Sequence, residues 1–454
     1  MNPEIFREYD IRGRVGADFE AADFRAIGQA YGAMIGEDAR VALGHDVRES
    51  SPPLAQAFES GLRAAGLEVL RLGEVPTPVV YFAVHQHDLD GGVQITGSHN
   101  PVDYNGIKMM RGKHSFYGAA IRELSERLGK RAAAGPGAAR DLEITGADVE
   151  AACARGTPRR PLKVVVDAGN GCAWELAPRI LRAMGCEVVE LFCEPDGTFP
   201  NHIADPTLPE TLVTLRERVL AEGADLGLAF DGDADRLGAL DATGRIVWGD
   251  QLLALFAREV LESRPGAPVL FEVKCSKGLI EDIEAHGGRP VMTRTGHSII
   301  KEAMKREGSP LAGEMSGHLF FADDWFGFDD GIYAAARLVR LVSRSPSGLA
   351  ALVDSIPAYH ATPEIRVPCA DRRKFDAVEQ VRRQFAPSHP VSDIDGARID
   401  FARGWGLVRA SNTQPVIVVR AEGKTRWDRD DILSRLQQAL AAAGGDASAC
   451  ARRE

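Results

Sequence analysis

The sequence has no paired cysteine motif and no long apolar run. Its seven cysteines are scattered without a C-x-x-C pair, which is typical of reduced thiols in a cytoplasmic protein. Charged residues follow directly after Met1–Ile5, and no apolar stretch is long enough to span a bilayer. Neither a signal peptide nor a membrane span is predicted, and a cytoplasmic location without a membrane partner is expected.

Positive charge is also scarce overall. The formal net charge of −11 argues against a nucleic acid or an anionic membrane as a general partner, because both require a basic surface. An anionic substrate would need positive charge gathered locally in a cleft. The G-x-x-x-x-G-K-[ST] motif is missing as well, so a P-loop nucleotide triphosphatase is unsupported. A monomer is expected, although nothing in the sequence determines the oligomeric state.

An internal repeat organises the 454 residues. Leu62–Val69 recurs almost letter for letter as Leu181–Val188, and each copy reads as a helix end, a glycine after the last turn and the start of a strand. A looser third copy runs from Val269 to Val291. Strand, helix and strand at this spacing form a βαβ unit, so three consecutive α/β domains are predicted.

These repeats predict an α/β fold of three similar domains with mixed, mainly parallel sheets. Beyond about Tyr359, alternating apolar segments such as Ala397–Phe401 indicate a smaller α+β domain with an antiparallel sheet. The predicted domains, arranged around a central cleft, cover residues 1–143, 144–246, 247–358 and 359–454.

An acidic run, Asp231–Arg236, places three carboxylates at alternate positions. Alternate side chains of an extended segment point the same way, so the acids would repel one another unless a cation lay between them. Oxygen ligands without a nearby His or Cys favour magnesium or calcium over zinc. An EF-hand does not fit, because Arg236 and Ala242 stand where that loop needs Gly and Glu.

The acidic run is one of three polar loops that follow equivalent strands. Thr96–Pro101 follows the strand that ends at Ile95, and Gly313–His318 follows Pro310–Ala312. Ligands of open α/β sheets bind outside the carboxyl ends of strands, so the three loops can converge on one site. The serine in the first loop, Ser98, can then act as a nucleophile or carry a phosphate beside a metal.

The C-terminal domain offers a fourth polar loop, Arg409–Pro415. Its guanidinium, hydroxyls, amide and backbone N–H groups suit a phosphate, although a polar β-turn is an equal alternative from this segment alone.

With its motifs T-G-S-H-N-P, D-G-D-A-D-R, G-E-M-S-G-H and R-A-S-N-T in this order, and Tyr9–Gly13 near the start, the chain resembles the α-D-phosphohexomutase family. The likeness extends over essentially the full length and is strongest to the bacterial phosphomannomutase/phosphoglucomutase group. It implies reversible phosphoryl transfer between C1 and C6 of hexose phosphates, with a hexose 1,6-bisphosphate as intermediate and activator.

The resemblance implies that Ser98 is the phosphoserine and that it binds Mg²⁺ together with Asp231, Asp233 and Asp235. The same motifs are expected in a phosphoglucosamine mutase, although Met315 favours the hexose group. A metal-dependent phosphoserine hydrolase and a non-catalytic sugar-phosphate sensor are the alternatives from other classes. The preferred sugar stays open.

For acid–base chemistry, Lys108 and His318 are the candidates, while Arg12 and Arg236 supply positive charge. The other residues that the resemblance assigns to the site bind the substrate. They are Tyr9, His99, Asn100, Lys274, His297, Glu314, Ser316, Arg409, Ser411, Asn412 and Thr413.

Overall fold

The computed structural model describes residues 1–129, 136–411 and 415–444. The chain divides into two compact units, Met1–Leu252 with Ser316–Val353, and Leu253–Met315 with Asp354–Glu454. Both contain helices and β-sheets, which confirms the predicted α/β class. The four predicted domain boundaries are finer than this division and stay predictions, as does the central cleft.

The first unit begins with a mixed seven-stranded sheet. Its strands are β1 (Ile11–Arg14), β2 (Arg40–His45), β3 (Glu68–Glu74), β4 (Gly91–Ile95), β5 (Tyr104–Arg111), β6 (His114–Ser115) and β7 (Ala139–Asp141). The order is β1-β5-β4-β2-β3-β7, with β6 paired to β5. Strands β4, β2, β3 and β7 are parallel, whereas β5 is antiparallel to its neighbours β1, β4 and β6.

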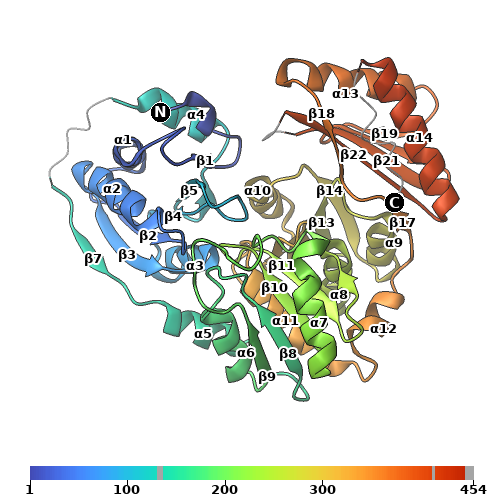
Figure 1. The fold of residues 1–454 in the computed structure, drawn as a ribbon, viewed down its shortest axis with the longest axis horizontal. Coiled ribbons are helices and arrows are strands. Elements are labelled where there is room, and N and C mark those ends of the chain that lie inside the picture. The colour runs from blue at the N-terminus through green and yellow to red at the C-terminus, as the bar shows by residue number, and fades with distance from the viewer. Residues whose placement is uncertain (130–135, 412–414, 445–454) are drawn as a thin grey trace. The chain divides into compact units, whose positions relative to one another are not determined.

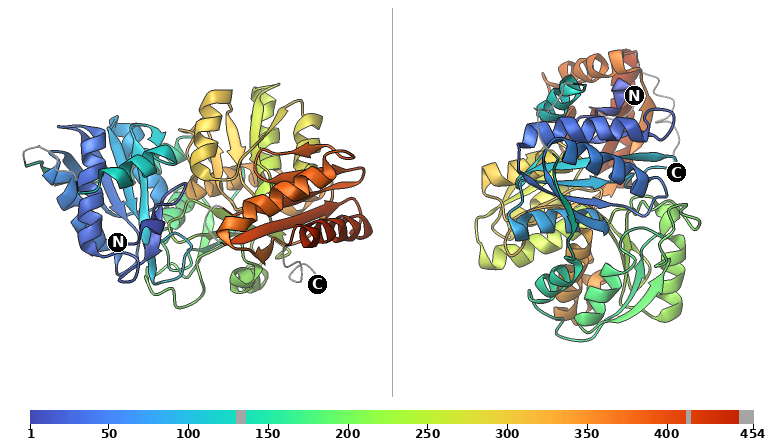
Figure 2. Two further views of the ribbon diagram at one scale, coloured as in Figure 1. Left: turned by 90° about the horizontal axis from the view of Figure 1, so that it is seen from above. Right: turned by 90° about the vertical axis from the view of Figure 1, so that its left-hand side faces the viewer.

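Helices cover both faces of this sheet. They are α1 (Ala21–Ile35), α2 (Ser51–Ala64), α3 (Thr77–His87) and α4 (Ala119–Arg127). Helices α1 and α2 lie side by side on one face (Figure 1), and the right-hand view of Figure 2 places them in front of the strands. Gly91 faces Tyr31 of α1, whereas Gly92 faces Val80 and Val84 of α3, so α3 packs on the opposite face.

A second mixed sheet of the first unit has the order β12-β11-β10-β8-β9. Its strands are β8 (Lys163–Asp167), β9 (Glu187–Leu191), β10 (Leu226–Phe230), β11 (Leu237–Asp241) and β12 (Ile246–Val247). Strand β8 is parallel to β9 and β10, and β11 is antiparallel to β10 and β12. The same unit contains η1 (Pro3–Ile5), α5 (Thr145–Cys153), α6 (Leu176–Ala183), η2 (Pro209–Leu212), α7 (Val213–Glu222), β16 (Leu319–Phe321), α11 (Gly331–Arg344) and α12 (Gly348–Asp354).

The second unit begins within α8 (Gly249–Ser263) and holds two different sheets. In the first, β13 (Pro268–Glu272) is parallel to both β14 (Arg289–Thr293) and β15 (Leu311–Gly313). Helices α9 (Lys277–Ala285) and α10 (His297–Glu307) connect these strands.

The C-terminal sheet is antiparallel throughout its described pairings. Its strands are β17 (His360–Ala361), β18 (Ile365–Pro368), β19 (Val391–Ser392), β20 (Ala397–Phe401), β21 (Gly404–Ala410) and β22 (Val416–Gly423). Helices α13 (Asp371–Phe385) and α14 (Arg426–Ala442) share one apolar core with it, and Figure 1 shows both helices beside these strands. This confirms the predicted α+β part.

The predicted repeat is confirmed in all three copies. Helices α2, α6 and α9 each end two residues before a glycine, and β3, β9 and β14 each begin two residues after it. Gly66, Gly185 and Gly287 have φ values of 87°, 94° and 74°, a left-handed conformation that favours glycine. Within the described residues, no helix has both the length and the apolar content needed to cross a membrane.

Candidate active site

Ser98 follows β4 in a buried, strained loop. Its φ is +48°, a left-handed conformation that is uncommon for a residue with a side chain. The hydroxyl donates a hydrogen bond to Asp231 Oδ2 over 3.0 Å and lies 3.1 Å from His99 Nδ1. The structure therefore brings the serine loop and the acidic run together.

The acidic run follows β10, and its three aspartates are fully buried. Asp231, Asp233 and Asp235 each offer an oxygen, and these oxygens lie within 4.8 Å of one another. They converge through a turn, with Ala234 at φ +60° and its N–H bonded to the Asp231 carbonyl. The extended geometry expected for this run was wrong, but the three carboxylates nevertheless lie close together.

This oxygen set fits a hard divalent cation. Asp233 Oδ1 is buried and has no hydrogen-bond partner among the described residues. A buried acceptor without a partner is costly unless something binds it. Carboxylate oxygens with a serine oxygen beside them match the preferences of Mg²⁺ and Ca²⁺. The three aspartates can therefore bind a metal.

The charges at this cluster act on one another. Lys108 Nζ donates to Asp233 Oδ2 over 2.7 Å and to Asp235 Oδ2, and Thr77 also donates to Asp233. Burial and then the neighbouring carboxylates raise the pKa of Asp231 well above its usual value. At Asp233, Lys108 and Thr77 outweigh burial and Asp235, so its pKa is lowered. Lys108 lies here as a cation between carboxylates.

His318 and Arg236 border the same cluster. His318 Nε2 lies 3.1 Å from Asp235 Oδ1, and its Nδ1 lies 3.2 Å from Ser316 Oγ. Arg236 Nε is 3.4 Å from His318 Nε2, and the two residues form an antiparallel β-bridge. Asp329, which the sequence analysis did not place in the site, offers a further oxygen within 4.8 Å of ligand atoms of His318 and Asp235.

Arg12 also contacts the serine loop, to which His99 and Asn100 belong. Arg12 Nη1 donates to the Thr96 carbonyl over 3.0 Å and pairs with Asp10. Loss of hydration, followed by the nearby Arg236 cation, lowers the pKa of His99 to about 3, so this imidazole is neutral at physiological pH. Tyr9 and Asn100 are half-buried.

Two residues beside Ser98 were missed by the sequence analysis. Arg48 and Asp46 follow β2 and bond to the serine loop. Arg48 also lines a cavity of about 60 Å³ next to Ser98, together with Asn100, Pro101, Val102, Phe199, Ile203 and Ala204. The sequence analysis identified three site loops because each is polar and follows a strand. The loop after β2 has the same property, so this signal could have indicated Asp46 and Arg48.

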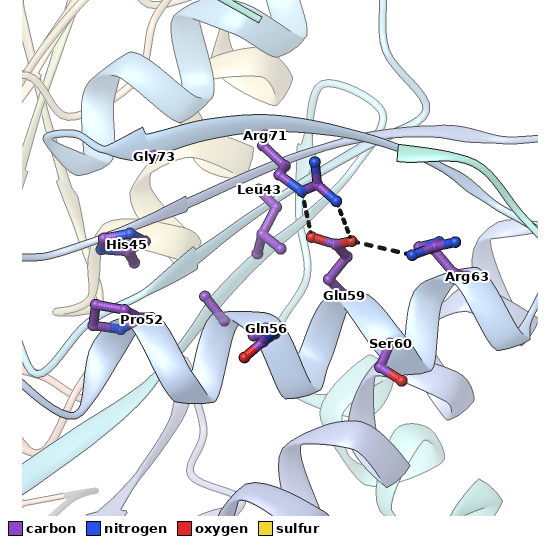
Figure 3. A pocket seen from close by; sticks show the side chains of 10 residues that line it. Leu43, His45, Pro52, Gln56, Glu59, Ser60, Arg63, Arg71 and Gly73 are labelled. Atoms are coloured by element: carbon purple, nitrogen blue, oxygen red, sulfur yellow. Dashed lines mark hydrogen bonds and ion pairs between the residues drawn. The ribbon is translucent and has the colours of Figure 1, made fainter. Parts of the chain in front are cut away.

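A larger hollow of about 530 Å³ lies elsewhere in the first unit, beside α2 (Figure 3). Arg71 forms two hydrogen bonds with Glu59, and Arg63 is 3.6 Å from the same carboxylate. Its lining contains none of the predicted site residues.

The second unit contains the predicted sugar-binding carboxylate. Glu314 is buried, and its Oε1 accepts a hydrogen bond of 2.7 Å from Gly296 N. Glu272, which sequence reasoning missed, accepts from the backbone of Lys274 and the hydroxyl of Thr295. Burial raises the pKa of Glu272, although the Lys274 cation opposes this.

The cations of this unit are paired with carboxylates. Lys274 Nζ lies 3.4 Å from Glu364 and 4.0 Å from Glu272. Arg409 Nε donates to Asp395 Oδ2 over 2.6 Å. His297 begins α10 and is half-buried.

The predicted phosphate loop, Arg409–Pro415, starts later than expected, because Arg409 and Ala410 still belong to β21. Ser411 is buried, and its carbonyl accepts a hydrogen bond from Lys374 Nζ. On the neighbouring strand, Arg420 is buried, and its Nε and Nη1 have no hydrogen-bond partner in the part of the chain that the structure describes. Sequence reasoning missed both cations, which lie outside the R-A-S-N-T motif. Asn412 and Thr413 lie outside the described residues.

Most predicted residues of the first unit lie together, whereas the others belong to the second unit. The first unit brings the serine, the aspartates, Lys108, Arg236 and His318 together, with Arg12, His99 and Ser316 adjoining them. The second unit carries Lys274, His297, Glu314, Arg409 and Ser411.

Family models match nearly the whole chain. The models are described as phosphoglucomutase/phosphomannomutase alpha/beta/alpha domains I, II and III and the C-terminal domain of the same family. They match residues 3–132, 147–244, 248–359 and 364–442.

Individual relatives agree with these matches. The phosphomannomutase/phosphoglucomutase of Pseudomonas aeruginosa is 44% identical over 443 residues, 96% of each chain. The phosphoglucomutase of Neisseria gonorrhoeae is 43% identical over 447 residues, again 96% of each chain. A crystal structure of a phosphoglucomutase/phosphomannomutase family protein from Burkholderia thailandensis has a TM-score of 0.92 and 41% identity, covering 98% of each chain. The chain therefore belongs to the phosphoglucomutase/phosphomannomutase family.

Proposed function

We propose that this chain is a phosphomannomutase/phosphoglucomutase that interconverts the 1-phosphates and 6-phosphates of mannose and glucose through a phosphorylated Ser98. The observation that carries the proposal is the contact of 3.0 Å between the Ser98 hydroxyl and the buried aspartate cluster. Relatives that are 44% identical over 96% of the chain have this activity in their names. A cytoplasmic location and a monomeric state are part of the proposal.

Ser98, Asp231, Asp233 and Asp235 are the residues that would hold Mg²⁺. When bound, the metal neutralises negative charge on the phosphoryl group during its transfer. The ligand oxygens come from two loops, and the Ser98 hydroxyl already contacts one aspartate. The protein fold itself therefore holds Ser98 next to the aspartates.

In the proposed reaction, the phosphoryl group moves from Ser98 Oγ to the free O6 or O1 of a hexose monophosphate. The bond from phosphorus to Ser98 breaks, and a bond to the sugar oxygen forms. The sugar hydroxyl gives its proton to a base, and Ser98 Oγ regains a proton when the phosphoryl group has left. The product is a hexose 1,6-bisphosphate. This intermediate reorients end over end in the site and then returns its other phosphoryl group to Ser98.

His318 is the preferred base in this scheme. Its imidazole lies beside Asp235 and Ser316, and an imidazole can hold the proton that the sugar hydroxyl gives up. Lys108 donates to two carboxylates, which suits a fixed positive charge better than a base. Arg12 and Arg236 add to that charge.

Residues of the second unit would hold the sugar in both orientations. A carboxylate such as Glu314 can accept hydrogen bonds from the O3 and O4 hydroxyls even when they exchange places. Arg409 and Ser411, with Asn412 and Thr413, would bind the phosphate that is not reacting. Because neither orientation needs a contact to the C2 hydroxyl, both glucose and mannose are expected substrates.

A paired assay tests the function. Purified protein with Mg²⁺ and a trace of the 1,6-bisphosphate should convert glucose 1-phosphate and mannose 1-phosphate to their 6-phosphates. Release of inorganic phosphate instead would indicate a phosphoserine hydrolase, and conversion of glucosamine phosphate alone would indicate a phosphoglucosamine mutase. Failure to convert any of these sugars would refute the proposal.

A further inference from the structure

Asp46 and Arg48 lie in the loop after β2 and contact the serine loop. Each is about 1% exposed, although both are charged. Buried charges are costly unless they are paired and fully hydrogen-bonded. The bonds that these two side chains make therefore show what they hold in place.

The guanidinium of Arg48 bonds to three backbone carbonyls of the serine loop. Nη2 donates to the carbonyl of Ser98 over 2.9 Å and to that of Asn100 over 2.6 Å. Nη1 donates to the carbonyl of Pro101 over 2.7 Å. One rigid planar group thus spans the nucleophile and the residues that follow it.

The carboxylate of Asp46 organises the other side of the loop. Its Oδ2 accepts from Thr96 Oγ1 over 2.8 Å, from Gly97 N over 2.9 Å and from Arg48 Nε over 3.2 Å. Its Oδ1 accepts from Arg48 N over 3.0 Å and from the Ser51 hydroxyl. Thr96 Oγ1 in turn accepts from Ser98 N over 2.8 Å, so the backbone of Ser98 is held from both sides.

Close packing leaves this arrangement little freedom. A Cβ on Gly97 would lie 2.2 Å from Arg48 Nε, so the loop backbone lies directly on the guanidinium. The ring of Phe199 covers Arg48 at 4.9 Å. Ser98 keeps a positive φ of 48° between these contacts, and this backbone conformation directs its hydroxyl to Asp231.

We infer that Arg48, oriented by Asp46, is a positioning residue that fixes the strained backbone of Ser98 so that the hydroxyl meets the aspartate cluster. The inference rests on the proposed function for its kinetic consequence, because Arg48 touches the loop backbone and not the reacting groups. Lys cannot replace the guanidinium, since an ammonium lacks the planar fork that reaches three carbonyls. Asn cannot replace Asp46, since either amide position would face at least two donors.

Two variants test the inference, Arg48→Lys and Asp46→Asn. Each should lower kcat by about 100-fold, as small misplacements of reacting groups do, while KM for hexose phosphate stays at the wild-type value. Amide hydrogen exchange of residues 96–101, measured on unphosphorylated protein without metal, should become faster in both variants.

Arg337→Lys is the matched control. Arg337 lies in the same unit, is 2% exposed, pairs with Asp323 and Asp324, and covers the ring of Phe321 at 4.7 Å. This variant should lower the melting temperature without changing kcat or exchange in residues 96–101.

The inference is overturned if Arg48→Lys keeps wild-type kcat and exchange, or if its only effect is the loss of melting temperature that Arg337→Lys shows. If one of the two variants is too unstable for kinetic measurements, hydrogen exchange in the other variant decides. If wild-type protein never carries phosphate on Ser98, the proposed function fails, whereas the exchange data still test the hold of Arg48 on the loop.

Discussion

The two units carry opposite electrostatic designs. In the first, three buried carboxylates meet one buried ammonium, Lys108, and the excess of negative charge suits a divalent cation. In the second, Arg409 and Lys274 are held by carboxylates, and Lys374 and Arg420 add further buried cations. An acidic chain can thus serve anionic substrates, because each charge is concentrated where it is needed.

Removal of the Ser98 hydroxyl, the proposed nucleophile of the first unit, should have the largest effect. Ser98→Ala should lower mutase activity by about 10⁴-fold or more, as loss of a nucleophile does elsewhere. Intact-mass analysis after incubation with the 1,6-bisphosphate should find phosphate on wild-type protein only. Phosphate retained in Ser98→Ala would place the carrier on another residue.

Removal of the Lys108 ammonium tests the excess of negative charge at the aspartate cluster of the first unit. Lys108→Met should lower the free energy of unfolding without metal by about 3 kcal/mol, because it leaves buried carboxylates uncompensated. The same change should strengthen Mg²⁺ binding measured by calorimetry, since a competing positive charge is lost.

Lys274→Met gives the matching change in the second unit. It removes an ammonium that lies near Glu272 and Glu364, and it should destabilise the protein without altering Mg²⁺ affinity. Equal effects of the two variants on Mg²⁺ binding would contradict the contrast between the units.

A change at the phosphate loop should have a smaller effect. Arg409→Lys removes the planar fork and its bond to Asp395, so kcat/KM should fall by about 10-fold to 100-fold, the usual range for a charged hydrogen bond. The affinity for Mg²⁺ should not change. The rise in melting temperature that Mg²⁺ causes should also equal that of the wild-type protein. A loss of Mg²⁺ binding in this variant would show that Mg²⁺ binding at the aspartate cluster depends on the phosphate loop.

The smallest effect concerns a buried acid of the first unit outside the aspartate cluster. Asp330 caps α11 by accepting from Tyr333 N over 2.8 Å, and burial raises its pKa to about 7. Its folded-state pKa exceeds the unfolded value, so its stabilising contribution is full below about pH 4 and is lost as the pH rises through 7.

Wild-type protein should therefore lose about 1 kcal/mol of unfolding free energy from this group between pH 6 and pH 8. Asp330→Asn, which keeps a capping side chain, should flatten that part of the pH profile in urea titrations. Asp148, whose pKa burial also raises, acts in the same direction and leaves a residual slope. A variant with the full wild-type slope would show that Asp330 does not titrate there.

Local patterns were sufficient for much of the fold. The glycines at 66, 185 and 287 mark helix ends because a left-handed residue there suits only a few side chains. The strand-end position of Thr96–Pro101 and of Asp231–Arg236 also follows from nearby residues, because an apolar run ends where polar residues begin.

Other features depended on residues far apart in the chain. The extended geometry expected for Asp231–Arg236 was wrong because a turn at Ala234 brings the carboxylates together. Asp46 and Arg48 were missed at the site because the serine-loop residues that they contact lie about 50 residues away along the chain. Asp329 was missed although one of its neighbours, His318, is close in sequence, because the other, Asp235, lies on a distant segment. No local periodicity encodes such a contact.

By itself, the sequence determined the α/β repeats and the polar loops that follow their strands, since these depend on local patterning and residue type. Only the tertiary structure decided that Ser98 is strained, that Arg48 and Asp46 hold it and that Lys108 lies among the aspartates. Backbone strain and buried ion pairs are maintained by packing between distant segments, and that packing exists only in the folded chain.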